Sequence, residues 1–252
     1  MSFNEVYITN TSSFFPNNPV SNDEMEDYLG YINGQPSKSK RIVLRNNGIT
    51  NRYYALTKDR KVTHTNAQIT AEAVKALLAN DDTKLKAIDL LSCGTSTPDQ
   101  VMPSHGVMVH GLLPETNSIE VVSPAGVCCA GMHALKYAYM AIKTGDASLA
   151  VATGSERFST LLISDVFEDE AKKLQELEEN PYIGFEKEFL RWMLSDGAAA
   201  FLMTNKKNET GLSLKVEWLE GFSYANKMEA CMYSASEKQK DGSLKSYMEF
   251  TH

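Results

Sequence analysis

The residues best suited to chemistry are two adjacent cysteines, Cys128 and Cys129, which stand where a β-rich run meets a helix. Residues 119–122 are β-formers, residues 124–126 break the run, and from Ala130 onward apolar residues recur at helical spacing. A thiol in the first turn of such a helix faces unpaired backbone N–H groups and the positive end of the helix dipole. Both favour the thiolate, which is the nucleophilic form. The position therefore predicts covalent catalysis by one of the two cysteines.

The alternative is that both cysteines are small buried hydrophobic residues, which is the commoner fate of a free cysteine. The chain has four cysteines, the others being Cys93 and Cys231, and no CxxC spacing suggests zinc or a redox pair. Adjacent cysteines rarely bridge each other. This usage fits a reducing cytoplasm, which is the location we predict.

The elements that must position the cysteines alternate between strands and helices. Apolar runs predict strands at 6–8, 85–92, 119–122, 147–153, 197–203 and 212–218, and helical spacing predicts helices at 23–29, 67–79, 104–113 and 130–144. Gly145 is the expected end of the helix that follows the cysteines. Several strands are apolar on both faces, which is typical of a sheet covered on both sides by helices. We therefore expect a layered α/β fold with a buried thiol at a helix N-terminus.

Composition narrows the class of partner. The 252 residues carry a formal net charge of −7, which argues against nucleic acid as a partner. No apolar run approaches the roughly 18 residues that a membrane helix needs, so we predict no membrane association. The N-terminal segment lacks the basic and apolar regions of a secretory signal.

The segment CAGMHALKYA at 129–138 resembles the active-site signature of the β-ketoacyl-acyl carrier protein synthase III family, which has the thiolase fold. In that family the nucleophile is the cysteine directly before a small residue and a glycine. Cys129 matches this position, whereas Cys128 falls where the family usually has alanine. Further segments resemble the family in the same order along the chain: residues 9–26, 46–55, 94–104, 154–159 and 193–203. The resemblance implies a thiolase-like α-β-α-β-α layered fold with Cys129 as nucleophile.

The resemblance also implies an acyltransferase reaction. Cys129 would take the acyl group of a thioester, and a decarboxylative Claisen condensation with malonyl-acyl carrier protein would give a β-ketoacyl product. The implied partners are an acyl carrier protein, an acyl thioester substrate and a second copy of the chain in a homodimer. The implied chemistry needs no metal and no cofactor beyond carrier or coenzyme A thioesters.

Three residues match substrate-binding positions of the family. Arg52 ends the Gly-Ile-x-x-Arg segment that begins at Gly48, and Arg45 stands three residues before that glycine, displaced by one from the family position. Met102 matches a position that reaches across the dimer towards the neighbour's acyl pocket; the alternative is a loop methionine that packs on its own core. Members that use a coenzyme A primer commonly have a tryptophan before this segment, whereas the first tryptophan here is Trp192. A carrier-protein donor is therefore the alternative to coenzyme A.

Along the chain, we expect residues 1–205 to form a complete first thiolase-like half and residues 206–252 to start a second half that is largely missing. Residues 167–191 are predicted to be a helical insertion with a solvated charged face, and its length hints at a secondary-metabolite branch of the family. The family's histidine and asparagine belong to the second half, so the fragment alone is expected to be inactive in condensation.

Other charged and polar residues near the cysteines receive structural interpretations. His133, one turn beyond Cys129, is either a base or, more commonly for such a position, a hydrogen-bonded core histidine. Glu156 and Arg157 are interpreted as a structural ion pair at a strand end, with an active-site pair as the alternative.

Two other functions stay open at this point. A hydroxymethylglutaryl-coenzyme A synthase-like or chalcone-synthase-like enzyme would use the same cysteine with different partners around it. A non-catalytic partner subunit of a ketosynthase is the alternative from another class. The intact cysteine motif argues against the partner subunit, and the missing half argues for it.

Overall fold

The computed structural model describes residues 3–166, 189–228, 232–238 and 244–250. The chain divides into two compact units. Unit 1 comprises Met1–Asn18, Thr63–Arg157 and Asp196–Gly221, and unit 2 comprises Pro19–Val62, Phe158–Ser195 and Phe222–His252. The two cysteines of the predicted site lie in unit 1.

A six-stranded sheet forms the centre of unit 1. Its strands are β1 (Tyr7–Phe14), β4 (Leu90–Gly94), β5 (Glu120–Val122), β6 (Leu149–Glu156), β7 (Gly197–Thr204) and β8 (Leu214–Lys215). Their order across the sheet is β5-β4-β6-β7-β1-β8. β4 runs parallel to both β5 and β6, whereas β7 runs antiparallel to β6 and β1. The mixed sheet places the ends of β4 and β6 side by side, with Gly94 opposite Gly154.

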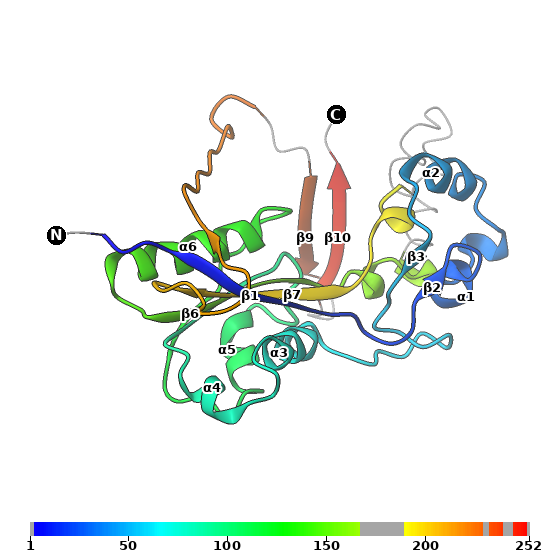
Figure 1. Ribbon diagram of the computed structural model, residues 1–252. Helices are drawn as coiled ribbons and strands as arrows, with labels where there is room; N and C mark the ends of the chain where they lie inside the picture. The colour runs from blue at the N-terminus through cyan, green and yellow to red at the C-terminus, as the bar shows by residue number, and fades with distance from the viewer. Residues whose placement is uncertain (1–2, 167–188, 229–231, 239–243, 251–252) are drawn as a thin grey trace. The chain divides into compact units, whose positions relative to one another are not determined.

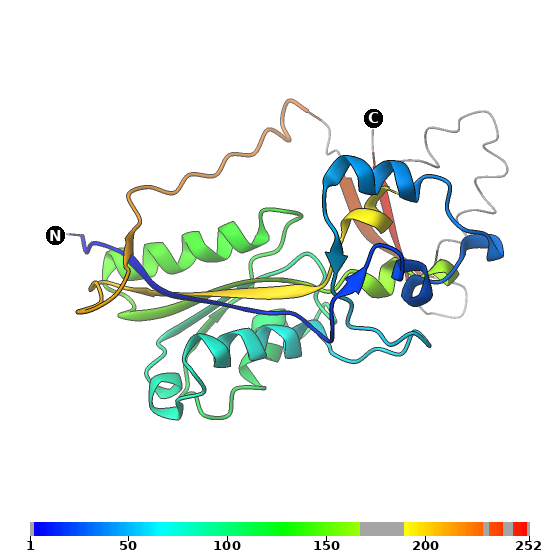
Figure 2. The same cartoon turned by 45° about the vertical axis from the view of Figure 1, so that its right-hand side comes forward.

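Helices cover both faces of this sheet, as the apolar strands predict (Figure 1). The helices of unit 1 are α3 (Asn66–Leu77), α4 (Asp82–Lys86), α5 (His105–His110) and α6 (Ala130–Thr144). Figure 2 shows α6 on one face and the other three on the opposite face. Thr65 and Gln68 form a capping box at the start of α3, and Gly145 ends α6 in the left-handed conformation, as predicted.

The core between α6 and the sheet is built largely from short side chains. Ala138, Ala141 and Ile142 on α6 are buried in one cluster with Ala150 and Ala152 of β6. Small side chains on both surfaces let the helix lie close to the strands. The buried, alanine-rich face of α6 therefore sets the distance between this helix and the sheet.

Two of the predicted strands differ in the structure. Residues 85–92 were expected to form one strand, but α4 extends to Lys86 and β4 begins only at Leu90. The Asp81 carboxylate accepts hydrogen bonds from the backbone N–H groups of Thr83 and Lys84, so the capping residue starts a helix there. The last predicted strand, at 212–218, is limited to Leu214–Lys215.

Unit 2 contains short elements around its own core. They are β2 (Val20–Ser21), α1 (Met25–Leu29), a 3-10 turn (Ile32–Gly34), α2 (Lys40–Asn47), β3 (Asn51–Arg52), a second 3-10 turn (Ser159–Leu161), β9 (Met232–Lys238) and β10 (Leu244–Phe250). β2 pairs with β3, and β9 pairs with β10, both antiparallel. Met25, Leu56 and Trp192 belong to the core of this unit. Helix α2 was not predicted, because its sequence is strongly polar and Val43 is its single buried residue.

Most of the predicted insertion, residues 167–188, lies outside the described residues. Its last residues do not form a solvated face, because Leu190 and Arg191 are buried. The Arg191 guanidinium donates to the carbonyl oxygens of Leu162 (2.9 Å), Leu29 (3.0 Å) and Gly30. The Arg191 guanidinium is thus buried where backbone carbonyl groups accept its hydrogen bonds. The prediction of a solvated face was therefore wrong for Leu190 and Arg191. Within the described part of the chain, no helix is long and apolar enough to cross a membrane.

A buried polar cluster joins α3, α5 and β6. His105 Nε2 lies 3.2 Å from both Thr70 Oγ1 and Ser155 Oγ, and Thr70 donates to Ser155 at 2.7 Å. His105 Nδ1 finds no hydrogen-bond partner among the described residues. Burial lowers the pKa of His105 from 6.5 to about 4, with the charge of Asp99 acting in the opposite direction. The fold therefore holds this histidine neutral.

The neutral histidine predicts a loss of stability in mild acid. Between pH 6.5 and about pH 4, His105 is protonated in the unfolded chain but stays neutral in the folded chain. The contribution of neutral His105 to the free energy of unfolding is therefore fully present above pH 6.5, and it falls by about 3 kcal/mol as the pH drops through this window. Urea unfolding of the wild type and of His105→Gln at a series of pH values measures it. The difference between the two should change across the window, and parallel curves would contradict the assignment.

Candidate active site

Cys128 and Cys129 lie in a loop between β5 and α6, which we call the cysteine loop (residues 124–129). Cys129 is the N-cap of α6, and its carbonyl accepts from the N–H of His133 at 3.0 Å. No side-chain hydrogen bond caps the helix. Both thiols are exposed, which corrects the expectation of a buried thiol. Burial begins at Ala130, because the small residues of α6 face the sheet only from that point.

Glycines hold the start of α6 against the ends of β4 and β6. A Cβ atom at Gly94 would lie 2.2 Å from the Ala130 carbonyl oxygen, far inside van der Waals contact. A Cβ atom at Gly131 would lie 3.3 Å from the Gly154 Cα atom, and the reverse substitution gives the same distance. Backbone therefore touches backbone at the first turn of α6, and the sheet fixes where the cysteines stand.

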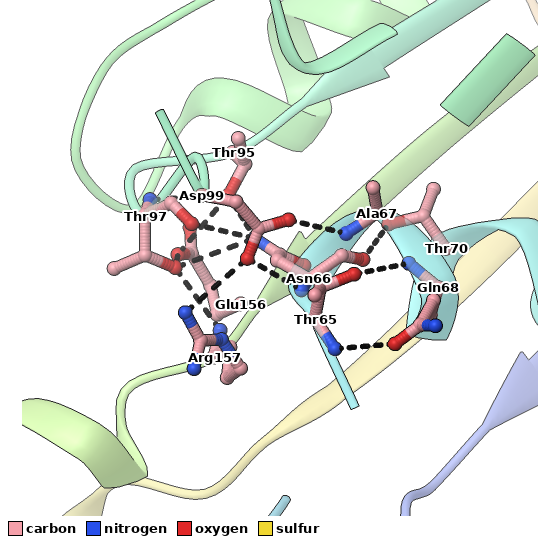
Figure 3. Close-up of polar contacts among 10 residues, drawn as sticks. All are labelled: Thr65, Asn66, Ala67, Gln68, Thr70, Thr95, Thr97, Asp99, Glu156 and Arg157. Atoms are coloured by element: carbon pink, nitrogen blue, oxygen red, sulfur yellow. Dashed lines mark hydrogen bonds and ion pairs between the residues drawn. The ribbon is translucent and has the colours of Figure 1, made fainter. Parts of the chain in front are cut away.

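The loop that follows β4 converges on one carboxylate (Figure 3). Glu156 Oε1 accepts from the N–H (2.7 Å) and the hydroxyl (2.6 Å) of Ser96. Glu156 Oε2 accepts from the hydroxyls of Thr97 (2.6 Å) and Thr95 (3.3 Å). The end of β6 thus holds the end of β4 through three consecutive residues.

A second carboxylate ties the same region to α3. Asp99 accepts from the N–H groups of Asn66 and Ala67, each at 2.9 Å, and pairs with the Arg157 guanidinium at 3.2 Å. A carboxylate at a helix N-terminus is favourable because it meets unpaired N–H groups. Arg157 therefore pairs with Asp99, and the predicted ion pair between Glu156 and Arg157 does not form.

The other predicted site residue in unit 1 is Met102. It is 82% exposed, and its carbonyl accepts from Gln100 Nε2 at 3.0 Å. The neighbouring Val101 is exposed as well. Met102 thus does not pack on the core of its own chain.

Arg45 and Arg52 belong to unit 2, whereas the two cysteines belong to unit 1. Arg45 lines a cavity of about 490 Å³ together with Lys40 and Arg41. Arg52 is 1% exposed and donates to the carbonyl oxygens of Trp192 (2.6 Å) and Asn51 (3.1 Å), and burial lowers the pKa of its guanidinium. Its predicted role in substrate binding stays a prediction.

The remaining histidine and cysteine candidates are His133, Cys93 and Cys231. His133 is exposed, so its interpretation as a core histidine was wrong. Cys93 is buried in β4, and burial raises the pKa of its thiol to about 12, which keeps it protonated and unreactive. Cys231 lies outside the described residues. Among the residues that the structure describes, the exposed thiols are those of Cys128 and Cys129.

Comparison with known proteins finds relatives named as β-ketoacyl-[acyl-carrier-protein] synthase III. No family model matches the chain. The chain is 30% identical over 155 residues to the β-ketoacyl-[acyl-carrier-protein] synthase III of Neisseria gonorrhoeae and 32% identical over 155 residues to that of Bordetella petrii. Each match covers 62% of this chain and 45% of the relative. The match therefore spans less than half the length of these relatives.

Solved structures show the same fold. A tetronic acid condensing enzyme, AbyA1, superimposes with a TM-score of 0.64 at 20% identity, covering 81% of this chain and 56% of that one. The 3-oxoacyl-(acyl carrier protein) synthase III of Pseudomonas aeruginosa superimposes with a TM-score of 0.58 at 18% identity, covering 94% and 58%. In sequence the chain is thus similar to β-ketoacyl-[acyl-carrier-protein] synthase III proteins, and it shares the thiolase fold of the solved 3-oxoacyl-(acyl carrier protein) synthase III.

Proposed function

We propose that the chain carries the nucleophile of a condensing acyltransferase and that Cys129 is that nucleophile. The observation that supports this most directly is the exposed Cys129 thiol at the uncapped N-terminus of α6, which the sheet holds in place. The printed names of the relatives, which are synthases acting on carrier-protein thioesters, point to the same chemistry.

The first step of the proposed reaction acylates the cysteine. The Cys129 thiolate attacks the thioester carbonyl, and a tetrahedral oxyanion forms. The carbon–sulfur bond to the carrier then breaks, and the carrier thiolate leaves and takes a proton. The backbone N–H of Cys129 is the proposed oxyanion donor, a type of contact whose loss commonly costs about 100- to 1000-fold in rate.

The second step forms a carbon–carbon bond. A malonyl-acyl carrier protein loses carbon dioxide, and the resulting enolate carbon attacks the carbonyl of the acyl-cysteine. The bond to the Cys129 sulfur breaks, the thiolate returns, and a β-ketoacyl thioester leaves. The reaction needs no cofactor beyond the thioesters themselves.

The substrate-binding proposals follow from charge and exposure. Arg45 lines a cavity with Arg41, Lys40 and Asp23, and Lys40 is paired with Glu26, so the two arginines are the groups proposed to bind a phosphate such as that of a carrier-bound pantetheine. Exposed Met102 is proposed to reach the acyl pocket of a second copy of the chain in a homodimer. The buried Arg52 would act by holding the backbone at Trp192 rather than by touching the substrate. We propose an acyl carrier protein as partner and the cytoplasm as location.

Intact-mass measurement tests the proposed function. The purified chain is incubated with a series of acyl thioesters of different chain length and then digested to map any adduct. We expect a mass increase equal to the acyl group, located on the peptide that contains Cys129. A chain that stays unmodified with every donor would refute the proposal and favour a non-catalytic partner subunit.

A further inference from the structure

We propose that Glu156 is a positioning residue that sets the place of the cysteine loop through the three residues that follow β4. Glu156 does not touch the cysteines in this proposal and acts through Thr95, Ser96 and Thr97. The inference rests on the proposed role of Cys129 as nucleophile.

The first step of the argument is that two of these three residues, Thr95 and Ser96, lie directly against the cysteine loop. Thr95 forms a parallel bridge with Ala125, and its N–H lies 3.4 Å from the Pro124 carbonyl oxygen. The Ser96 hydroxyl lies 3.3 Å from the Val127 carbonyl oxygen. A shift of residues 95–97 therefore moves the backbone on which Cys128 and Cys129 stand.

The second step is that the site requires a carboxylate and tolerates no amide. Thr95 Oγ1 already accepts from Asn66 Nδ2 (2.9 Å) and the Thr97 N–H (3.1 Å), so its proton is left to donate to Glu156. Thr97 Oγ1 accepts from the Arg157 N–H (3.0 Å) and lies 3.4 Å from Asn66 Nδ2, so it too donates. Oε1 faces the backbone N–H of Ser96. Both oxygens of Glu156 thus face donors, and the NH₂ group of a glutamine would meet a donor in either orientation.

The third step predicts the sign of the effect on the thiol. If the loop loses its support, the Cys129 sulfur moves away from the positive end of the α6 dipole, and less thiolate forms. Removal of a negative charge alone would act oppositely and favour the thiolate. The direction of the change in reactivity therefore separates positioning from simple electrostatics.

Alkylation by iodoacetamide, mapped to Cys129 by mass spectrometry as a function of pH, provides the measurement. We expect Glu156→Gln to react about two- to fivefold more slowly at neutral pH, with the midpoint of its pH–rate profile moved upward. Glu156→Asp keeps the negative charge but has a shorter side chain, so Cys129 should also be alkylated more slowly in this variant. It provides the test if the glutamine variant does not fold.

The matched control is Asp89→Asn. Asp89 accepts from the N–H groups of Ser148 (2.8 Å) and Leu149 (3.0 Å), where it holds the opposite end of β6. Its substitution should lower the melting temperature and leave the alkylation rate unchanged. Glu156 variants that react at the wild-type rate or faster would overturn the proposal. Alkylation needs no acyl donor, so this result is independent of whether the wild type accepts an acyl group.

Discussion

Replacement of Cys129 by alanine is expected to remove the acyl adduct, lowering acylation by at least about 1000-fold. Alanine keeps the backbone N–H groups and the helix start but has no sulfur to attack the thioester. Within the described residues, the other exposed thiol is that of Cys128, and Cys93 is held protonated by burial. Intact-mass measurement after incubation with an acyl thioester gives the adduct fraction for each variant.

Cys128→Ala is the matched control, because it removes the other exposed thiol, at the adjacent position. We expect this variant to acylate at close to the wild-type rate. If the adduct instead disappears in Cys128→Ala and persists in Cys129→Ala, the assignment of the nucleophile is wrong and the two cysteines exchange roles. Persistence in both single variants would contradict Cys129 as the single site of acylation.

Gly94→Ala is expected to destabilise unit 1 by about 3 kcal/mol and to slow alkylation of Cys129. The added methyl group would lie 2.2 Å from the Ala130 carbonyl oxygen, 2.4 Å from its carbonyl carbon and 2.7 Å from the Gly131 nitrogen. These are backbone atoms, so no rotamer change can relieve the contact. The start of α6 must move away from β4, and the thiol moves with it. Urea unfolding gives the change in stability, and peptide mapping gives the alkylation rate.

Gly111→Ala tests whether the effect comes from this contact. Gly111 follows α5 in the same unit, and its added methyl group would find its nearest atoms at 3.5 and 3.6 Å, which is ordinary contact. Its backbone is right-handed helical, a conformation that alanine adopts readily. We expect a change within about 1 kcal/mol and an unaltered alkylation rate. Equal losses in the two variants would show that the approach of Gly94 to Ala130 has no special role.

The helix that carries Cys129 and its flanking strands could be predicted from the sequence because their signals are local. Apolar spacing from Ala130 and the stop at Gly145 place α6 correctly, and the apolar run that ends near Thr153 becomes β6. The exposure of the thiol could not be predicted in this way. It depends on which part of the chain lies over the first turn of α6, and periodicity reports only the face that is buried.

The role of Glu156 was missed for a related reason. Its partners stand 59 to 61 positions earlier in the chain, and a sequence pattern gives no register between β4 and β6. The adjacent Arg157 offered a simpler pairing, but neighbouring residues of an extended strand point to opposite faces. The run Thr-Ser-Thr directly after a buried strand was the available signal, because three hydroxyls at a strand end need an acceptor.

The contact between Gly131 and Gly154 has a consequence for thermal behaviour. Most packed surfaces in proteins are made by side chains, whose conformers exchange more as temperature rises. A surface made by main-chain atoms has no such exchange, so the distance between α6 and β6 at this point should hardly change on warming. The Cys129 sulfur would then keep its position relative to β6 until the sheet itself unfolds. Its reactivity should follow a single activation energy up to the unfolding transition.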